Sequence, residues 1–242
     1  ISIVSYPRPE ARIVLIANVA VASEYRRRGI ASALTRHALR YISQWPRAEV
    51  WLQVRSENQA AIQMYHQLGF EFIYALSQWR YSPAQRLTAS PRAGFPRELH
   101  VGARRLADWK TQARWLAINY PRQTRWYLNA NLDAFSPWSF LIPARWQALL
   151  ALSHLALRDD RQLLGVLTCQ KTRLSSDLVW LALPDEPGED MRADMLLSAL
   201  LKKEEPVRPL SLEYPLGRAQ LGIQSAGFTL ARNLDWMKLR SL

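Results

Sequence analysis

Residues 19–32 combine a glycine and three consecutive arginines just before a helical segment, a combination suited to holding an anion. Gly29 lets the backbone approach a ligand closely, and the helix is expected to begin at about Ile30. The first N–H groups of a helix and the positive end of its dipole attract phosphate groups, and arginines 26–28 add charge. The stretch therefore predicts a phosphate cradle. An ordinary strand-to-helix turn with solvated arginines is the alternative.

Strands and helices alternate around this stretch and must position it. Residues 13–21 are a buried-strand candidate, and residues 31–41 have apolar side chains at helical spacing. A second strand is expected at 50–54, a second helix at 58–68 and a third strand at 71–81. This order predicts an α/β arrangement in which helices cover a sheet.

The same order occurs twice in the chain. Gly69-Phe70 and Gly227-Phe228 both follow a helical stretch and precede an apolar strand, and 227 exceeds 69 by 158. The second copy's matching elements are expected at residues 178–183, 191–201, 210–214, 218–225 and 229–239. Further elements of that copy are expected before them, at residues 98–104, 107–119, 145–151, 154–158 and 163–171.

The two copies are expected to differ in completeness. Only residues 1–11 precede the first strand of the first copy, so this copy is expected to lack its N-terminal part. We therefore predict the C-terminal part of one domain at 1–82, a proline-rich linker at 83–96 and a second domain at 97–242.

Two motifs give the first copy a family resemblance. The run Arg-x-x-Gly-x-Ala at residues 26–31 resembles the acyl-CoA signature of the GNAT superfamily of N-acetyltransferases, Gln/Arg-x-x-Gly-x-Gly/Ala. Residues 52–70 resemble the family's strand followed by Asn-x-x-Ala and Tyr-x-x-x-Gly-Phe, most closely in the branch that acetylates the N-terminal alanine of a ribosomal protein. The resemblance covers residues 11–81. It implies two tandem GNAT-like α/β (α+β) domains, each with a mixed, mostly antiparallel sheet flanked by helices.

The resemblance also implies individual roles. Tyr65 matches the catalytic tyrosine that protonates the departing CoA thiolate, which a phenol can do, although an inward-facing tyrosine can also be simply core. Asn58 matches an asparagine that contacts the cofactor, and it also suits a helix N-cap. In relatives the strand end pairs with the pantetheine arm and the loop wraps the pyrophosphate. The cofactor-binding residues implied are Val19, Ala20, Val21, Arg26, Arg27, Arg28, Gly29, Ile30, Ala31, Ser32 and Asn58.

Gln53 departs from the pattern. In the ribosomal-protein branch this position is a glutamate that acts as general base, and a glutamine accepts no proton at neutral pH. Glu24, Glu57 and His66 lie near the motifs and are expected to be surface residues. The base is therefore another group, a water relay, an amine that is already neutral, or a group from the missing N-terminal part.

The second copy has the same order of strands and helices but lacks the Arg-x-x-Gly-x-Ala motif. Residues 183–191 form an acidic loop with two prolines in place of the arginine loop, and carboxylates repel a pyrophosphate. Ile223 occupies the tyrosine position and Leu216 the asparagine position. The second copy is therefore expected to bind no cofactor and to shape the acceptor site.

Composition excludes several classes of protein. The 242 residues are 49% hydrophobic and carry a net charge of +12, the basic residues being spread along the chain, so neither disorder nor nucleic-acid binding is expected. A lone Cys169 excludes an internal disulfide, and the four histidines lack metal-ligand spacing, so no metal is expected. With no apolar run of 18 residues, we expect no membrane span and a cytoplasmic protein.

These observations predict an N-acyltransferase that moves an acetyl group from acetyl-CoA to an amine by direct attack. The amine is a small molecule or a peptide N-terminus, and the protein is a monomer or a homodimer. A non-catalytic CoA-binding sensor or interaction module is the alternative.

Overall fold

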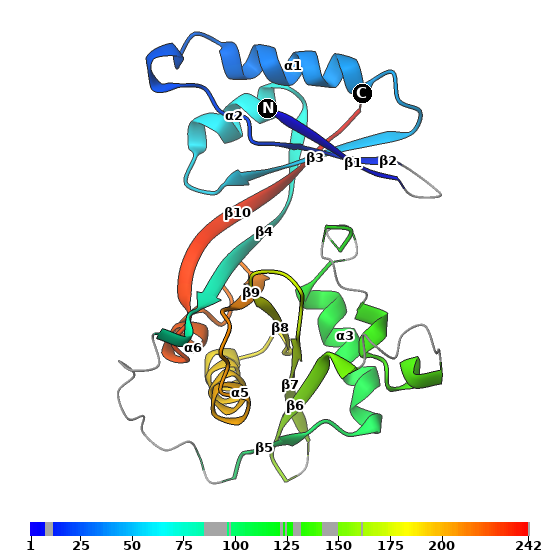
Figure 1. Ribbon diagram of the computed structural model, residues 1–242, viewed down its shortest axis with the longest axis vertical. Coiled ribbons are helices and arrows are strands. Elements are labelled where there is room, and N and C mark those ends of the chain that lie inside the picture. The colour runs from blue at the N-terminus through cyan, green and yellow to red at the C-terminus, as the bar shows by residue number, and fades with distance from the viewer. Residues whose placement is uncertain are drawn as a thin grey trace. The chain divides into compact units, whose positions relative to one another are not determined.

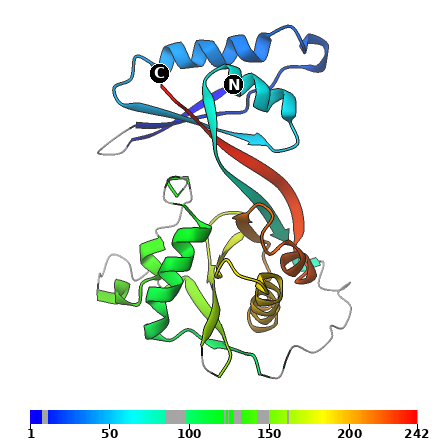
Figure 2. The same cartoon turned by 180° about the vertical axis from the view of Figure 1, so that it is seen from behind.

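A computed structural model describes residues 1–7, 12–84, 96, 98–121, 123, 125–127, 132–141, 150–160 and 162–241. The chain divides into two compact units (Figures 1 and 2). The first unit comprises Ile1–Leu76 and Asn233–Leu242, and the second comprises Ser77–Arg232. No helix among the described residues is long and apolar enough to cross a membrane.

The first unit is a mixed sheet with two helices on one face. Its strand order is β1-β2-β3-β10-β4, in which β2 and β3 are parallel and β1/β2 and β3/β10 are antiparallel. Parallel β2 and β3 need a crossover, which helix α1 provides. The elements are β1 (Ser2–Pro7), β2 (Arg12–Ala17), α1 (Ile30–Ile42), β3 (Ala48–Arg55), α2 (Gln59–Gln67) and parts of β4 (Phe70–Tyr81) and β10 (Thr229–Leu239).

Alternation along the strands builds the core of this unit. Val50, Leu52 and Val54 point to one face of β3, where they pack against buried side chains of both helices, among them Ile42 of α1 and Tyr65 of α2. Both helices lie on this same side of the sheet in Figure 1. The core therefore fixes the two helix starts to one face of the sheet.

The second unit repeats this plan at greater length. Its strand order is β4-β9-β8-β7-β6-β5, with β8 and β9 parallel around a crossover helix and antiparallel pairs from β8 to β5. The elements are β5 (His100–Ala103), α3 (Trp109–Asn119), β6 (Leu152–Arg158), β7 (Leu163–Gln170), β8 (Asp177–Ala182), α5 (Glu189–Glu204), β9 (Leu210–Pro215) and α6 (Gln220–Ser225), together with short 3-10 turns at Leu106–Asp108, Leu132–Phe135 and Pro137–Leu141.

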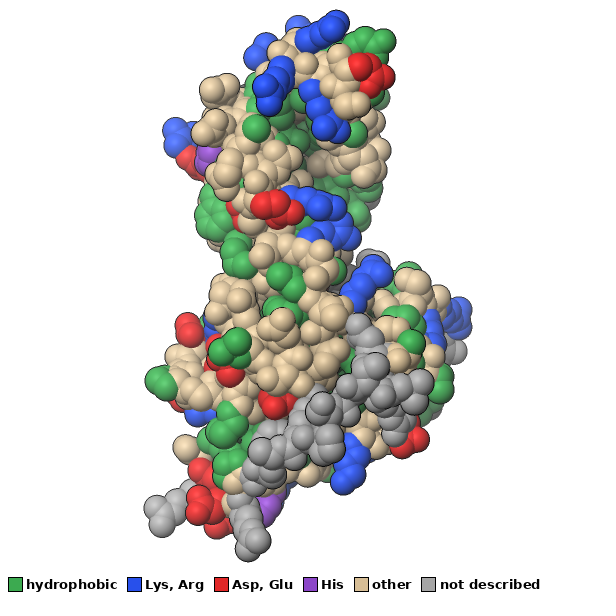
Figure 3. All heavy atoms as spheres, turned by 90° about the vertical axis from the view of Figure 1, so that its left-hand side faces the viewer, with side chains coloured by type: hydrophobic (Ala, Val, Ile, Leu, Met, Phe, Trp, Pro, Cys, Tyr) green, Lys and Arg blue, Asp and Glu red, His purple; other side chains and the backbone are tan. Residues whose placement is uncertain are grey.

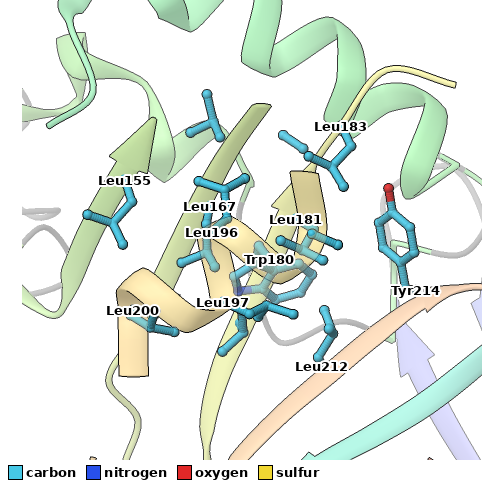
Figure 4. Close-up of a cluster of buried hydrophobic side chains, with 14 of the residues drawn as sticks. Leu155, Leu167, Trp180, Leu181, Leu183, Leu196, Leu197, Leu200, Leu212 and Tyr214 are labelled. Carbon is cyan, nitrogen blue, oxygen red and sulfur yellow. The ribbon is translucent and has the colours of Figure 1, made fainter. Parts of the chain in front are cut away.

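A leucine-rich core holds the second unit together. Figure 4 shows Leu196, Leu197 and Leu200 of α5 among side chains of the sheet, including Leu167 and Trp180. These five side chains are at most 4% exposed. Helix α3 covers the opposite face of the sheet (Figures 1 and 2). The mixed, mostly antiparallel sheets with flanking helices confirm the predicted fold class.

Strands β4 and β10 each contribute to both units. Strand β4 begins in the first unit and ends in the second, whereas β10 does the reverse. They are neighbours in the strand order. Arg240, which directly follows β10, binds Glu71 of β4 in the first unit, and Arg232 of β10 donates to Gln78 of β4 in the second. The two copies of the repeat therefore exchange the ends of their last strands.

This exchange separates the repeat copies from the compact units. The first unit ends at Leu76 and takes in the last ten residues of the chain, whereas the predicted copies break at 82 and 97. The predicted domain bounds stay a prediction about the repeat. Most of the predicted linker (85–95) and of the predicted helix at 145–151 lies outside the described residues.

Equivalent glycines of the two copies have similar backbone conformations. Gly69 and Gly227 have φ values of 89° each, in the left-handed region that precedes β4 and β10. Gly29 and Gly188, with φ of 73° and 88°, cap the N-termini of α1 and α5. The copies therefore share their turn chemistry as well as their element order.

Candidate active site

A cavity of about 660 Å³ lies in the first unit, between the loop that follows β2 and the N-terminal parts of α1 and α2. Its volume is within the usual range of ligand pockets. It gathers two sequence segments that lie about 30 residues apart in the chain. It is lined by Val19, Ala20, Val21, Tyr25, Arg26, Arg27, Gly29, Ile30, Ala31, Ser32, Asn58, Ala60, Ala61, Met64 and Tyr65.

Gly29 ends the loop and opens α1. Its left-handed φ of 73° suits glycine, and a Cβ added there would meet no atom within 4 Å, so backbone conformation sets the requirement. No side chain caps α1, and its first turn contains no acidic residue. The start of α1, at Ile30, Ala31 and Ser32, therefore borders the cavity with backbone N–H groups that no side chain caps.

The arginines of the loop take different positions. Arg26 and Arg27 line the cavity, and the Arg26 Nε donates to the Val21 carbonyl at 3.1 Å, which closes the loop on itself. Arg28 does not line it, because its guanidinium lies over the Tyr25 ring at 5.6 Å. Figure 3 shows Lys and Arg side chains gathered over α1 and the loop before it. The local field therefore favours an anionic ligand.

Strand β2 ends earlier than predicted. The sequence predicts a strand to Val21, but β2 ends at Ala17, and Asn18 turns the chain with a left-handed φ of 54°. The pairing of β2 with β3 ends at Ile16 and Leu52, so beyond this point the two strands part. Residues 19–21 therefore belong to no strand, and they border the cavity.

Asn58 and Tyr65 reach the cavity from α2. The Asn58 Oδ1 accepts from the Ala61 amide at 3.2 Å, so Asn58 is an N-cap and also a lining residue. Tyr65 is buried and contacts Phe70 edge-on at 5.8 Å between ring centres. Burial raises the pKa of the Tyr65 phenol above its ordinary value of 10.0. Tyr65 therefore remains protonated at neutral pH and is available as a proton donor.

The acidic and histidine residues near the two motifs are not among the residues that line the cavity. Glu24 accepts from the Ser23 hydroxyl at 3.1 Å, and Glu57 pairs with Arg55 at 3.6 Å on the surface. A ring nitrogen of His66 bonds the Phe70 carbonyl at 3.0 Å. Gln53 lies on β3 opposite Trp236 of β10. The identity of the base stays open.

In the second copy, helix α6 packs directly on the start of helix α5. A Cβ added to Gly222 of α6 would lie 1.9 Å from the carbonyl oxygen of Asp190 in α5, so the two helices are in direct backbone contact. The Gly222 amide donates to the Asp190 carboxylate at 2.9 Å. Arg218 binds Glu189 at 2.5 Å and lies 3.5 Å from Asp185. Internal ion pairs thus occupy the helix start where the first copy is open.

Sequence reasoning missed four lining residues: Tyr25, Ala60, Ala61 and Met64. Three of them follow from the helical period, because Ala61 lies four residues before Tyr65, and Ala60 and Met64 lie four residues apart. Among the described residues, no group of three or more His, Cys, Asp or Glu side chains could hold a metal ion.

Sequence comparisons match the part of the chain that carries the two motifs. The family model described as Acetyltransferase (GNAT) family matches residues 2–70. The [ribosomal protein bS18]-alanine N-acetyltransferase of Escherichia coli (strain K12) is 42% identical over 53 residues, which are 22% of this chain and 36% of that protein. The match thus spans little more than a third of the curated relative.

Comparisons of structure agree with the fold of the whole chain. A GCN5-related N-acetyltransferase from Sphaerobacter thermophilus covers 97% of this chain and 74% of its own, with a TM-score of 0.58 and 14% identity. One from Kribbella flavida covers 96% of this chain and 82% of its own, with a TM-score of 0.51 and 10% identity. Residues 2–70 therefore resemble the GNAT acetyltransferase family in sequence, and the fold of the chain is similar to that of GCN5-related N-acetyltransferases.

Proposed function

We propose that the first copy binds acetyl-CoA in the 660 Å³ cavity and transfers its acetyl group directly to an amine. The observation that carries this proposal is the joint lining of one cavity by the uncapped start of α1, two arginines and Tyr65. The helix start and the arginines suit the pyrophosphate, and the backbone of residues 19–21 suits the amide-bearing pantetheine arm.

In the proposed reaction the amine nitrogen attacks the thioester carbonyl and the C–S bond breaks. Tyr65 gives its phenolic proton to the departing thiolate, and the new amide loses a proton to a base or to water, from which the Tyr65 phenolate is reprotonated. No acyl-enzyme is required. Cys169 of the second unit is a poor nucleophile, because burial raises the pKa of its thiol to about 12.

The acceptor proposed is a peptide N-terminus. It is supported by the curated relative's name, which specifies an alanine of a ribosomal protein as the acceptor in that enzyme. A peptide α-amine has a pKa near 8, so an appreciable fraction is neutral at pH 7.5 without a base. This property suits a site with Gln53 on β3. Small-molecule amines are the alternative acceptors.

The test is release of CoA thiol from acetyl-CoA with three acceptors: a peptide with a free N-terminal alanine, an Nα-blocked lysine peptide and a small primary amine. We expect thiol release with the alanine peptide. Saturable acetyl-CoA binding without thiol release from any amine would instead support a non-catalytic CoA-binding sensor.

A further inference from the structure

The end of β3 depends on the last strand of the chain. The pairing of β2 with β3 stops at Leu52, so within the described residues Gln53, Val54 and Arg55 pair with β10 alone. Helix α2 begins four residues beyond this end, at Gln59. Whatever fixes the turn between β3 and α2 therefore fixes the helix that carries Tyr65.

Ser56 is the point at which β10 holds this turn. Its amide donates to the Asn233 carbonyl at 3.1 Å, and its hydroxyl donates to the Asp235 Oδ1 at 2.5 Å, across 179 residues of sequence. A hydroxyl that donates to a carboxylate makes a short, strong hydrogen bond. The Ser56 carbonyl in turn accepts from the Gln59 side chain at 2.8 Å.

The contacts then continue into the cavity. The Asn58 amide donates to the Arg55 carbonyl at 2.9 Å, and the Asn58 side chain caps α2 at Ala61. Asn58, Ala61 and Tyr65 all line the cavity. A chain of hydrogen bonds therefore joins the carboxylate of Asp235 to the start of the helix that presents the proton donor.

We propose that Asp235 is a positioning residue of the acetyl-transfer site, acting through Ser56 on the start of α2. The proposal rests on the proposed function for its kinetic readout. If Asp235 has this role, the last strand of the second repeat copy helps to position the site of the first copy. Asp235 touches neither acetyl-CoA nor the reacting atoms in this account.

The test compares Asp235→Ala, Ser56→Ala and the double variant with Asp235→Asn, which keeps the acceptor oxygen. We expect each alanine variant to lower kcat by about tenfold, since small misplacements of catalytic groups cost that much or more, and to raise the Kd of acetyl-CoA. The double variant should lose no more than either single variant, because both break one contact. Asp235→Asn should retain kcat within about twofold.

Glu49→Ala is the matched control, because it removes the 2.8 Å ion pair between Glu49 and Lys238 that joins the same two strands. Hydrogen exchange at the Ala61 and Ile62 amides gives a readout that needs no ligand. Asp235→Ala should accelerate it, and Glu49→Ala should not.

The proposal fails if Asp235→Ala leaves exchange and acetyl-CoA binding unchanged, if Asp235→Asn is as damaging as alanine, or if Glu49→Ala has the same effects. Failure of the proposed function is a separate result. An intact protein without thiol release would disprove acetyl transfer, whereas the exchange and binding measurements would still decide the role of Asp235.

Discussion

Tyr65 has the properties that a proton donor to a thiolate needs. It lines the cavity, its ring is fixed against Phe70, and burial raises the pKa of its phenol above 10.0. A thiol has a pKa near 8.5, so a departing thiolate at neutral pH needs a group that is itself still protonated. At every pH below about 10, Tyr65 meets this requirement.

Replacing Tyr65 with phenylalanine tests this role directly. The variant keeps the ring and its packing and removes the proton, so we expect kcat to fall by about 100-fold or more. The Kd of acetyl-CoA, measured by calorimetry, should change by less than about twofold, because the phenol acts on the chemical step. An unchanged kcat would show that Tyr65 is only a core residue.

His154 of the second unit makes stability depend on pH. Burial and, to a smaller extent, the positive charge of Arg104 lower the pKa of His154 from 6.5 to about 3. Between these two pH values the unfolded chain binds a proton that the folded protein excludes. The free energy of unfolding of this unit therefore falls as pH drops below 6.5, by up to about 1.4 kcal/mol per pH unit.

The measurement is urea unfolding between pH 7.5 and 4. His154→Gln should flatten the slope, because glutamine does not titrate, although it also disturbs the 2.9 Å contact with Thr168. His100→Gln is the control, since 66% of the His100 side chain is exposed. Identical slopes in the wild type and His154→Gln would contradict the assignment.

At the scale of elements, the two copies differ in how their second helix packs against the start of their first. Helix α2 leaves space in front of the α1 start, whereas α6 packs directly on the start of α5 at Gly222. The sequence predicted the loss of cofactor binding from the acidic loop at 183–191. It did not predict the closure, because a close approach at one glycine leaves no periodic pattern.

Gly222→Ala tests this close contact. A Cβ would lie 1.9 Å from the Asp190 carbonyl oxygen, so α5 and α6 must separate, at a cost of about 3 kcal/mol. The midpoint of thermal unfolding should fall by several degrees. Gly102→Ala is the control, because no atom lies within 4 Å of its added Cβ. Equal midpoints for the two variants would show that the helices are not in contact.

The parts of the site that short sequence motifs encode were predictable, whereas those that depend on contacts between distant residues were not. The glycine loop, Asn58 and Tyr65 are local motifs, and all of them border the cavity. Arg28 does not line the cavity and lies over Tyr25 instead, a placement that depends on side-chain conformation and leaves its predicted role in cofactor binding a prediction. The early end of β2 was missed, because residues 19–21 are as apolar as a strand, and the pairing of β2 with β3 nevertheless ends at Ile16.

At the scale of the whole molecule, strands β4 and β10 each begin in one unit and end in the other. The sequence predicted the repeat and the mixed sheets, because the spacing of apolar residues within each segment indicates whether it forms a helix or a strand. Strand exchange could not be predicted in this way, because a strand's own pattern does not specify which copy provides its partner. The site of the first copy thereby includes Asn233 and Asp235 as neighbours of its α2 start.

Deletion of residues 233–242 tests this dependence. It removes the partner of β3 at residues 53–55, so we expect loss of acetyl-CoA binding and fast hydrogen exchange in β3. Deletion of the last two residues alone is the control and should change neither. A ten-residue deletion that still binds acetyl-CoA normally would show that the first unit is complete without β10.

The central claim is that one acetyl-CoA binds per chain, at the open copy. Calorimetric titration should give a stoichiometry of one, abolished by Gly29→Asp and retained by Gly188→Asp. The two substitutions are matched, since both glycines cap a helix with a left-handed φ and have open space around an added Cβ. Two sites per chain, no binding by the intact protein, or loss of binding only in Gly188→Asp would contradict the account.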